Sequence, residues 1–198
     1  MKGQVVCRVL LVAHNTLEGR SLTGTLVASG YVVRRATDGL DAIGKLREGP
    51  PDLIICHLAL PRMSGNEFLS VVRRRFPQIP VIAIRNETYS PEGADGTEAD
   101  ACFQEHGFSH AELLETMSDL LRNGTPRSPL PKAENQPVPG NRDGDGHYLV
   151  ICPHCLRPNN VPRSPYFAER ENTTVCIHCR SMVHFLADDG DSSAGSAA

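Results

Sequence analysis

The stretch that decides the fold of this chain is "PDLIICHLALPRMSG", residues 51–65. The four apolar residues 53–56 show no polar alternation, so a strand formed here must be covered on both faces. Such strands belong to parallel sheets with helices on each side, which predicts an α/β fold. Ligand sites in these sheets lie beyond the carboxyl ends of the strands, and His57 stands just past the run. His57 is therefore expected in the site.

Four more apolar runs surround this one. We predict strands at residues 5–13, 31–36, 53–56, 81–84 and 101–104, each bounded by Gly, Pro or polar residues. Periodic apolar residues predict covering helices over 16–30, 40–49 and 66–76, and a last helix that begins with the capping box Ser109 and Glu112. Pro91, Gly93 and Gly96 disfavour a stable helix in 86–100, where a short or frayed one is expected.

Composition limits the class of protein. The chain has 198 residues, of which 40% are hydrophobic and 22% charged, so it can bury a real core. Its formal net charge of −3 provides no global attraction to nucleic acid or to an anionic membrane. The apolar start "VVCRVLLVA" is interrupted by Arg8, is too short to span a bilayer and lacks a small-residue cleavage site. We therefore expect a cytoplasmic protein.

The chain divides at a segment that cannot pack a core. Residues 122–146 hold five prolines, four glycines and no aromatic residue, which is typical of a semi-extended linker. The final residues 187–198 are small, polar and acidic, as in a disordered tail. The predicted organisation is an α/β domain at 1–121, this linker, a small domain at 147–186 and the tail.

The first domain resembles a known family. The segments "VLLVAHN", "GYVVRRATDGLDAIGKL", "PDLIICHLALPRMSGNEFL" and "IPVIAI" are similar to the receiver domain of two-component response regulators. The resemblance implies a doubly wound sheet of five parallel strands in the order 2-1-3-4-5. It also implies an acidic pair after the first strand and an aspartate after the third, which together bind Mg²⁺ while the aspartate accepts a phosphoryl group.

The sequence departs from that pattern at every position of the phosphorylation site. The acidic pair aligns with Ala13 and His14, and the acceptor aligns with His57. The family's Thr or Ser after the fourth strand aligns with Arg85. Its lysine after the fifth strand aligns with Glu105 or with the next residue, His106. The chain is thus identified as a degenerate receiver, or pseudo-receiver.

These departures remove the chemistry that the family uses. Phosphoryl transfer depends on a divalent cation held by hard oxygen ligands, and an alanine and two imidazoles supply none, so no Mg²⁺ is expected. Two alternatives give His57 a specific chemical role: phosphorylation of its imidazole, or a transition metal bound by His14 and His57. The favoured interpretation is that His57 fills the vacated pocket, hydrogen-bonded to a neighbour.

The cysteines fall into two groups. Cys7, Cys56 and Cys102 stand singly in apolar segments and are interpreted as small buried hydrophobes. The others form two C-x-x-C pairs separated by twenty residues, which predicts a zinc ribbon with one structural Zn²⁺ per chain held by Cys152, Cys155, Cys176 and Cys179. A redox dithiol and a disulfide framework are the alternatives. We do not expect His154, His178 or His184 to be ligands.

These features predict a non-enzymatic signalling adaptor, in which a phosphorylation-independent receiver-like domain and a zinc ribbon both bind proteins. The first alternative is a transcription-associated nucleic-acid binder. In that case the ribbon would use its arginines and aromatic residues, Arg157, Arg163, Arg170, Arg180, Tyr166 and Phe167. The second alternative is a zinc- or redox-sensitive switch. The triplet Arg73, Arg74 and Arg75 is interpreted as a solvated helix C-terminus rather than a nucleic-acid patch.

Overall fold

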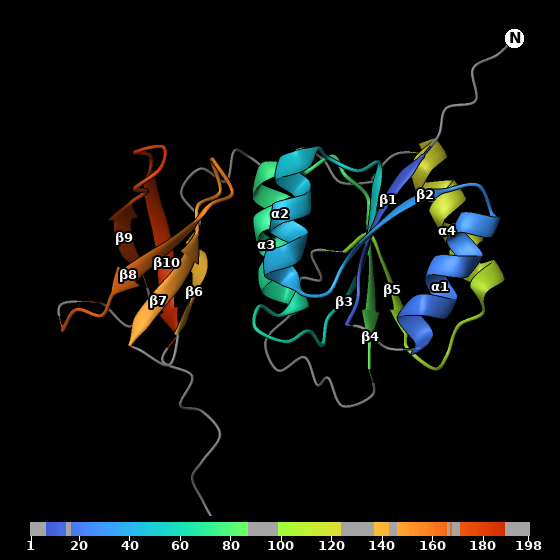
Figure 1. Cartoon of the computed structure of the whole chain (residues 1–198), viewed down its shortest axis with the longest axis horizontal. Helices are drawn as coiled ribbons and strands as arrows, with labels where there is room; N and C mark the ends of the chain where they lie inside the picture. The colour runs from blue at the N-terminus through green and yellow to red at the C-terminus, as the bar shows by residue number, and fades with distance from the viewer. Residues whose placement is uncertain are drawn as a thin grey trace, which may run out of the picture. The chain divides into compact units, whose positions relative to one another are not determined.

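The computed structural model describes residues 7–14, 17–86, 99–123, 137–142, 146–165, 167 and 171–188. The chain forms two compact units, Met1–Pro131 and Lys132–Ala198. Each unit contains one five-stranded sheet (Figure 1). No helix in the described part of the chain is long and apolar enough to cross a membrane.

The N-terminal sheet has the predicted topology. Its strands lie in the order β2-β1-β3-β4-β5, and every neighbouring pair is parallel. The strands are β1 (Arg8–Val12), β2 (Val32–Ala36), β3 (Leu53–His57), β4 (Val81–Arg85) and β5 (Ala101–Gln104). His57 is the last residue of β3, not the first residue beyond it, because it still pairs with Ile84 of β4.

Helices cover both faces of this sheet. Helices α2 (Gly39–Glu48) and α3 (Gly65–Arg75) lie on one face, and α1 (Leu17–Ala28) and α4 (His110–Asn123) lie on the other (Figure 1). The capping box that opens α4 is confirmed, since the Ser109 and Glu112 side chains each accept the other's backbone N–H. Of the short helix expected in 86–100, residues 87–98 lie outside the described part of the chain.

The core lies on the three central strands. Residues 9–12 of β1, 53–56 of β3 and 81–82 of β4 are fully buried. Apolar side chains on both faces of these strands leave water when the helices pack, which stabilises the fold by about 25 cal/mol per Å² of buried apolar surface. The uninterrupted apolar runs in the sequence are therefore explained by helix packing on both sides.

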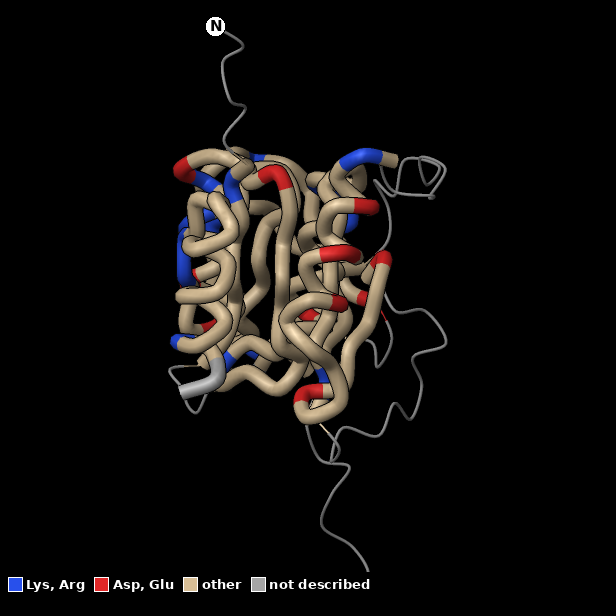
Figure 2. Tube along the Cα trace, turned by 90° about the vertical axis from the view of Figure 1, so that its right-hand side faces the viewer, with Lys and Arg blue, Asp and Glu red and all other residues tan. Residues whose placement is uncertain are grey.

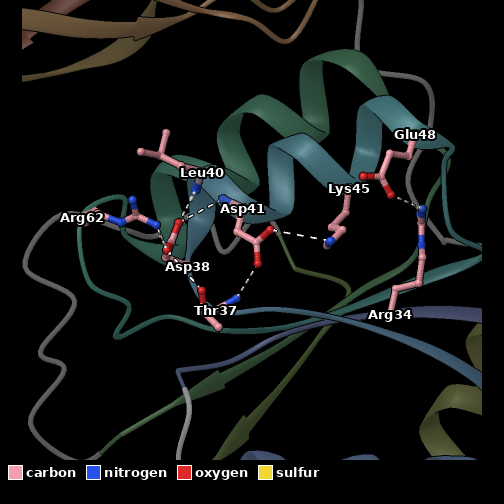
Figure 3. Close-up of polar contacts among 8 residues, drawn as sticks. All are labelled: Arg34, Thr37, Asp38, Leu40, Asp41, Lys45, Glu48 and Arg62. Carbon is pink, nitrogen blue, oxygen red and sulfur yellow. Dashed lines mark hydrogen bonds and ion pairs between the residues drawn. The ribbon is translucent and has the colours of Figure 1, made fainter.

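A polar cluster ties the loop after β3 to the start of α2 (Figure 3). The buried Asp38 side chain caps α2 by accepting the N–H groups of Leu40 and Asp41, at 2.9 and 3.0 Å, and it pairs with Arg62 from the loop. Burial alone would raise the pKa of Asp38, but the hydrogen bonds from Arg62 and the two amides outweigh it and lower that pKa. Arg62 has a φ of 64°, so the ion pair holds an unfavourable backbone conformation.

The interpretation of the arginine triplet as solvated is wrong for its first member. Arg73 is buried, and its guanidinium donates to Asp100 Oδ2 at 2.6 Å and to the carbonyl of Ile79 at 2.9 Å. Asp100 Oδ2 also accepts the N–H of Val81 at 2.8 Å. One buried ion pair thus joins the end of α3 to the starts of β4 and β5.

The C-terminal unit is a mixed sheet with the strand order β8-β7-β6-β10-β9. Its strands are β6 (Val138–Arg142), β7 (His147–Ile151), β8 (Pro158–Pro162), β9 (Asn172–Val175) and β10 (Met182–Asp188). Two expected boundaries are corrected here. Strand β6 lies inside the segment that was expected to be a linker, and β10 extends through the first two residues of the expected tail.

Strand β6 could not be predicted from composition, because it contains proline and glycine, which are typical of linkers. It pairs with β10 in parallel and with β7 in antiparallel fashion. A Cβ atom on Gly140 would lie 2.9 Å from both the carbonyl oxygen of Leu186 and the ring of Phe185, so only glycine fits there. The β7 ladder begins at Gly140, so Pro139 lies outside it. Composition alone cannot distinguish such a strand from a linker.

Three aromatic rings fill the core of the C-terminal unit. The ring centroid of Phe167 lies 6.0 Å from that of Tyr148 and 5.5 Å from that of Phe185. Tyr148 and Phe185 are buried. Four buried valines, Val138, Val150, Val161 and Val183, belong to the same cluster. Phe167 is therefore a core residue, which corrects its assignment as a candidate for base stacking.

We predict that Arg73→Met lowers the free energy of unfolding of the N-terminal unit by about 3–5 kcal/mol, because it leaves the Asp100 carboxylate buried without its counter-charge. The double variant Arg73→Met/Asp100→Leu should lose less stability than either Arg73→Met or Asp100→Leu alone. Arg75→Met, at an exposed position, is the matched control and should change stability by about 0.5 kcal/mol or less. Urea unfolding followed by circular dichroism measures all four, and additive losses would contradict the prediction.

Candidate functional site

The carboxyl ends of the parallel strands bring the predicted site residues to one edge of the sheet. Ala13 and His14 follow β1, His57 ends β3, Arg85 ends β4 and Glu105 follows β5. Ala13 is buried and donates its N–H to Ala36 at 2.9 Å, whereas His14 and Arg85 are exposed. The order of the strands thus places positions far apart in the sequence at a common edge.

Glu105 faces His57 across this edge. The carboxylate oxygen Oε1 lies 3.6 Å from His57 Nδ1, and both side chains are largely buried. The Glu105 N–H donates to the carbonyl of Arg85 at 2.8 Å, which fixes the turn after β5. Of the two residues that could align with the family's lysine, Glu105 is the one beside His57, and the exposed His106 follows it in the turn. The sequence pattern alone did not reveal this pair.

Two neighbouring cavities share the pair. The larger, about 240 Å³, is lined by His14, His57, Ala59, Pro61, Ile84, Asn86 and Glu105. The smaller, about 120 Å³, shares His57, Ile84 and Glu105 and is completed by Ser21, Leu22, Phe108 and His110. His110 Nδ1 is already engaged, at 2.9 Å from Thr25 Oγ1. The edge of the sheet is therefore hollow and lined with imidazoles.

The groups lining the larger cavity do not fit Mg²⁺. Among its described residues, Glu105 supplies the one carboxylate, and Mg²⁺ prefers several hard oxygen ligands in octahedral geometry. The transition-metal alternative also lacks support, because His14 and His57 belong to no group of three or more close ligands in the described part of the chain. The described lining of this cavity therefore lacks the set of oxygen ligands that Mg²⁺ prefers.

The four cysteines of the C-terminal unit do converge. The Sγ atoms of Cys152 and Cys179 lie 3.6 Å apart, as do those of Cys155 and Cys176, and all four lie within 4.8 Å of one another. A tetrahedral metal with bonds of about 2.3 Å to sulfur separates its ligand atoms by about 3.8 Å. The spacing therefore fits one tetrahedral metal ion with four thiolate ligands.

The two C-x-x-C turns have the same backbone geometry. The N–H of Leu156 donates to the carbonyl of Cys152 at 2.8 Å, and the N–H of Arg180 donates to that of Cys176 at 2.9 Å. Leu156 and Arg180 adopt φ angles of 56° and 61°, in the left-handed region. One turn joins β7 to β8 and the other joins β9 to β10, so two hairpins present their thiols to one point.

The environments of the thiols differ. Burial raises the pKa of Cys152 and of Cys155, so both favour the neutral thiol unless a metal binds. Hydrogen bonds from the side chain and backbone of Ser181 lower the pKa of the exposed Cys179 to about 6. A bound cation would favour the thiolate form of all four.

The three histidines in and after the C-x-x-C turns lie outside the ligand group. His178 Nε2 is 3.3 Å from the carbonyl of Pro158, and His184 Nδ1 is 2.9 Å from Glu171 Oε1. His154 is exposed within its turn. The group of possible ligands found among the described residues consists of the four cysteines.

Comparison with known proteins agrees with the geometry of the N-terminal unit. Residues 9–103 match the family model of the response regulator receiver domain. Among curated proteins, the chain is 28% identical over 120 residues to the response regulator MprA of Mycobacterium sp. strain KMS, a match covering 60% of this chain and 52% of that protein. MprA of Mycolicibacterium vanbaalenii is 29% identical over a match of the same extent. The chain thus spans about half the length of the curated relatives it matches.

Solved structures show the same fold. The chemotaxis response regulator CheY4 of Vibrio cholerae aligns with a TM-score of 0.51 and 27% identity, over 59% of this chain and 99% of that one. A CheY-like receiver domain protein of Methanospirillum hungatei aligns with a TM-score of 0.55 and 24% identity, over 60% of this chain and 95% of the other. The N-terminal unit of this chain is therefore a response regulator receiver domain.

Proposed function

We propose that this protein is a non-enzymatic signalling adaptor whose receiver domain works without phosphorylation and whose C-terminal unit is a zinc ribbon that binds other proteins. The observation that carries the proposal is the His57–Glu105 pair. It places an imidazole and a carboxylate where the family has an acceptor carboxylate and a lysine. The carboxylate of the pair thus stands after β5, whereas the family pattern has it after the third strand.

The His57–Glu105 pair argues against phosphorylation on electrostatic grounds. A phosphoryl group at His57 would bring negative charge close to the Glu105 carboxylate, which lies 3.6 Å from the ring in the unmodified protein. Ala13 and His14 offer no carboxylates for a cation that could neutralise this charge. The modified state would therefore be destabilised where the family's site stabilises it.

The receiver domain still has surfaces for partners. The outward positions of α4 carry Glu112, Glu115 and Asp119, all exposed, and Figure 2 shows acidic positions gathered along this helix. A negatively charged helix face favours a partner with basic side chains. The curated relatives are named response regulators, which is consistent with a partner in a signalling pathway.

Zinc is the metal that fits the cysteine cluster best. Four thiolates in tetrahedral geometry are the usual donors for structural Zn²⁺. Four protein ligands would fill the coordination sphere and leave no open position for a substrate. When bound, the metal would cross-link the two hairpins and contribute folding energy. Cys152, Cys155, Cys176 and Cys179 would hold it, one ion per chain.

The outer face of β9 and β10 favours a protein over nucleic acid as the partner of the ribbon. Val175 and Met182 pair across the two strands. Both are exposed, and two more exposed aliphatic residues are Ile177, in the turn after β9, and Leu186 of β10; the exposed fractions are Val175 57%, Ile177 76%, Met182 62% and Leu186 40%. Aliphatic side chains suit a protein interface, whereas binding of single strands uses exposed aromatic rings. The described aromatic rings of this unit lie in its core.

We predict that incubation with acetyl phosphate and Mg²⁺ adds no phosphoryl group to the wild type or to the His57→Asp variant. In both, the cation lacks the acidic pair, and Glu105 repels the product. The fourfold variant Ala13→Asp/His14→Asp/His57→Asp/Glu105→Lys restores each charged group and should accept phosphate. Intact-mass spectrometry measures the added mass. Stoichiometric modification of the wild type or the single variant would overturn the proposal.

We predict one zinc per chain in reduced, freshly purified protein, measured by elemental analysis. Cys176→Ser should lose the metal and unfold the C-terminal unit while the receiver domain stays folded, because the metal supplies much of the folding energy of so small a unit. Cys102→Ser is the control that should keep its zinc; Cys102 is a single thiol in β5 that is exposed, which corrects its interpretation as a buried residue. Protein without zinc, or a Cys176→Ser variant with full metal content, would refute the assignment.

We predict that the double variant Ile177→Ser/Met182→Ser keeps its zinc and changes stability by about 0.5 kcal/mol or less, since both side chains are exposed, but loses protein partners of the ribbon. Val32→Ser, at an exposed valine of the receiver domain, is the control and should keep them. Quantitative affinity purification compares the three proteins. Fluorescence anisotropy with labelled DNA and RNA tests the alternative, in which saturable binding would weaken steeply with salt.

A further inference from the structure

The two C-x-x-C hairpins of the C-terminal unit repeat one another in sequence and in backbone. Aligned on its cysteines, the segment "CPHCLRPN", residues 152–159, corresponds to "CIHCRSMV", residues 176–183. Each turn is followed by a residue with a left-handed φ, whose N–H donates to the carbonyl of the first cysteine. Asn159 and Val183 occupy equivalent positions, because each pairs in its hairpin with the residue two positions before the first cysteine.

One hydrogen bond breaks this repeat. The Ile177 N–H donates to Asn159 Oδ1 at 3.0 Å and so joins the second turn to the first hairpin. The equivalent bond cannot form between the first turn and the second hairpin, because Pro153 has no N–H and the side chain of Val183 has no acceptor. The sequence therefore supplies both groups of one bond and neither group of its counterpart.

The Asn159 amide is buried and bonded at both ends. Only 2% of the residue's surface is exposed. Its Nδ2 donates to the carbonyls of Arg157 and Val150 in the first hairpin, at 3.2 and 3.4 Å. These two bonds fix the orientation of the amide, so that Oδ1 is held toward the Ile177 N–H. A buried amide whose partners lie on two hairpins ties those hairpins together.

The bond to Ile177 lies next to the metal ligands. The N–H groups of His178 and Cys179 donate within the second turn, to Cys176 Sγ. The Ile177 N–H instead bonds outside the turn, to a residue of β8. His178 Nε2 lies 3.3 Å from the carbonyl of Pro158 in the same strand. Since Ile177 directly follows Cys176, these contacts hold the second turn against the first hairpin.

We propose that Asn159 is a positioning residue of the metal site, which holds the second C-x-x-C turn where all four thiols can bind one ion. The inference rests on the zinc site proposed above and adds a residue that is not a ligand. Asn159 acts through the Ile177 N–H and does not touch the metal. Residues that orient ligands by hydrogen bonds typically change metal affinity by about 10–100-fold.

The first test is a double-mutant cycle on the affinity of the full-length protein for Zn²⁺, measured by competition with a chromophoric chelator. Asn159→Leu should weaken binding about tenfold or more, because it leaves the Ile177 N–H without its acceptor. Ile177→Pro, which copies Pro153 of the first turn, removes the donor and should also weaken binding. The double variant should bind more tightly than the product of the two losses predicts. Additive losses, or wild-type affinity in Asn159→Leu, would overturn the proposal.

The second test, amide hydrogen exchange with excess Zn²⁺, separates positioning from general stability. The wild-type Ile177 amide should be protected although 76% of the residue's surface is exposed. In Asn159→Leu it should exchange about tenfold faster or more, whereas the Cys176 amide, which donates to the carbonyl of Ser181 at 2.9 Å, should keep its rate. Val161→Ala, at a buried valine of β8, is the matched control and should affect both amides alike. Equal acceleration of both amides in Asn159→Leu would refute the positioning role.

Failure of this inference can be distinguished from failure of the zinc assignment. A protein that takes up no Zn²⁺ contradicts the proposed function and this inference with it. Equal Zn²⁺ affinities of the wild type and Asn159→Leu contradict the role of Asn159 alone. If Asn159→Leu does not fold, Ile177→Pro removes the same bond from its other end, and wild-type affinity in that variant would refute the proposal.

Discussion

The burial of β1, β3 and β4 on both faces is the constraint on which the receiver domain depends. Strands without a polar face need helices on both sides, and the connections that provide those helices make the strands parallel. Parallel strands end at one edge, and that edge gathers Ala13, His14, His57 and Glu105. The packing of the core therefore creates the cavity whether or not the residues that line it keep the family's chemistry. The fold thus depends on the buried core rather than on the residues at this edge.

Most of the receiver fold could be predicted from the sequence, because each strand is a short apolar run and each helix has a periodic apolar face. The composition of the candidate site could be predicted as well, since His14 and His57 stand at fixed offsets from those runs. The pairing of His57 with Glu105 could not be predicted, because it depends on the register of β5 two strands away from β3. A one-residue shift there would have brought His106 to the same place.

Other features escaped prediction because they depend on tertiary contacts. Arg73 belongs to a basic run at a helix end, a pattern typical of solvated residues, yet it is buried because Asp100 lies opposite it. Phe167 sits among arginines in the sequence, and its position in an aromatic core follows only from the return of β10. Strand β6 contains Pro139 and Gly140, and the close approach of Phe185 that requires glycine is invisible in composition. In each case a distant partner determines the environment of the residue.

Strand β6 also sets the order in which the C-terminal unit can form. The hairpins β7–β8 and β9–β10 are local, but within the sheet they are joined through β6, whose Val138 pairs with Phe185 near the end of the described chain. On a ribosome, the first strand of this sheet must wait for the last one before the centre of the sheet can close. Until then, the two hairpins expose unpaired edges that can pair with other chains. A metal ion bound early by the four thiols would hold the hairpins together during that interval, so the supply of metal would affect the yield of folding as well as the stability of the product.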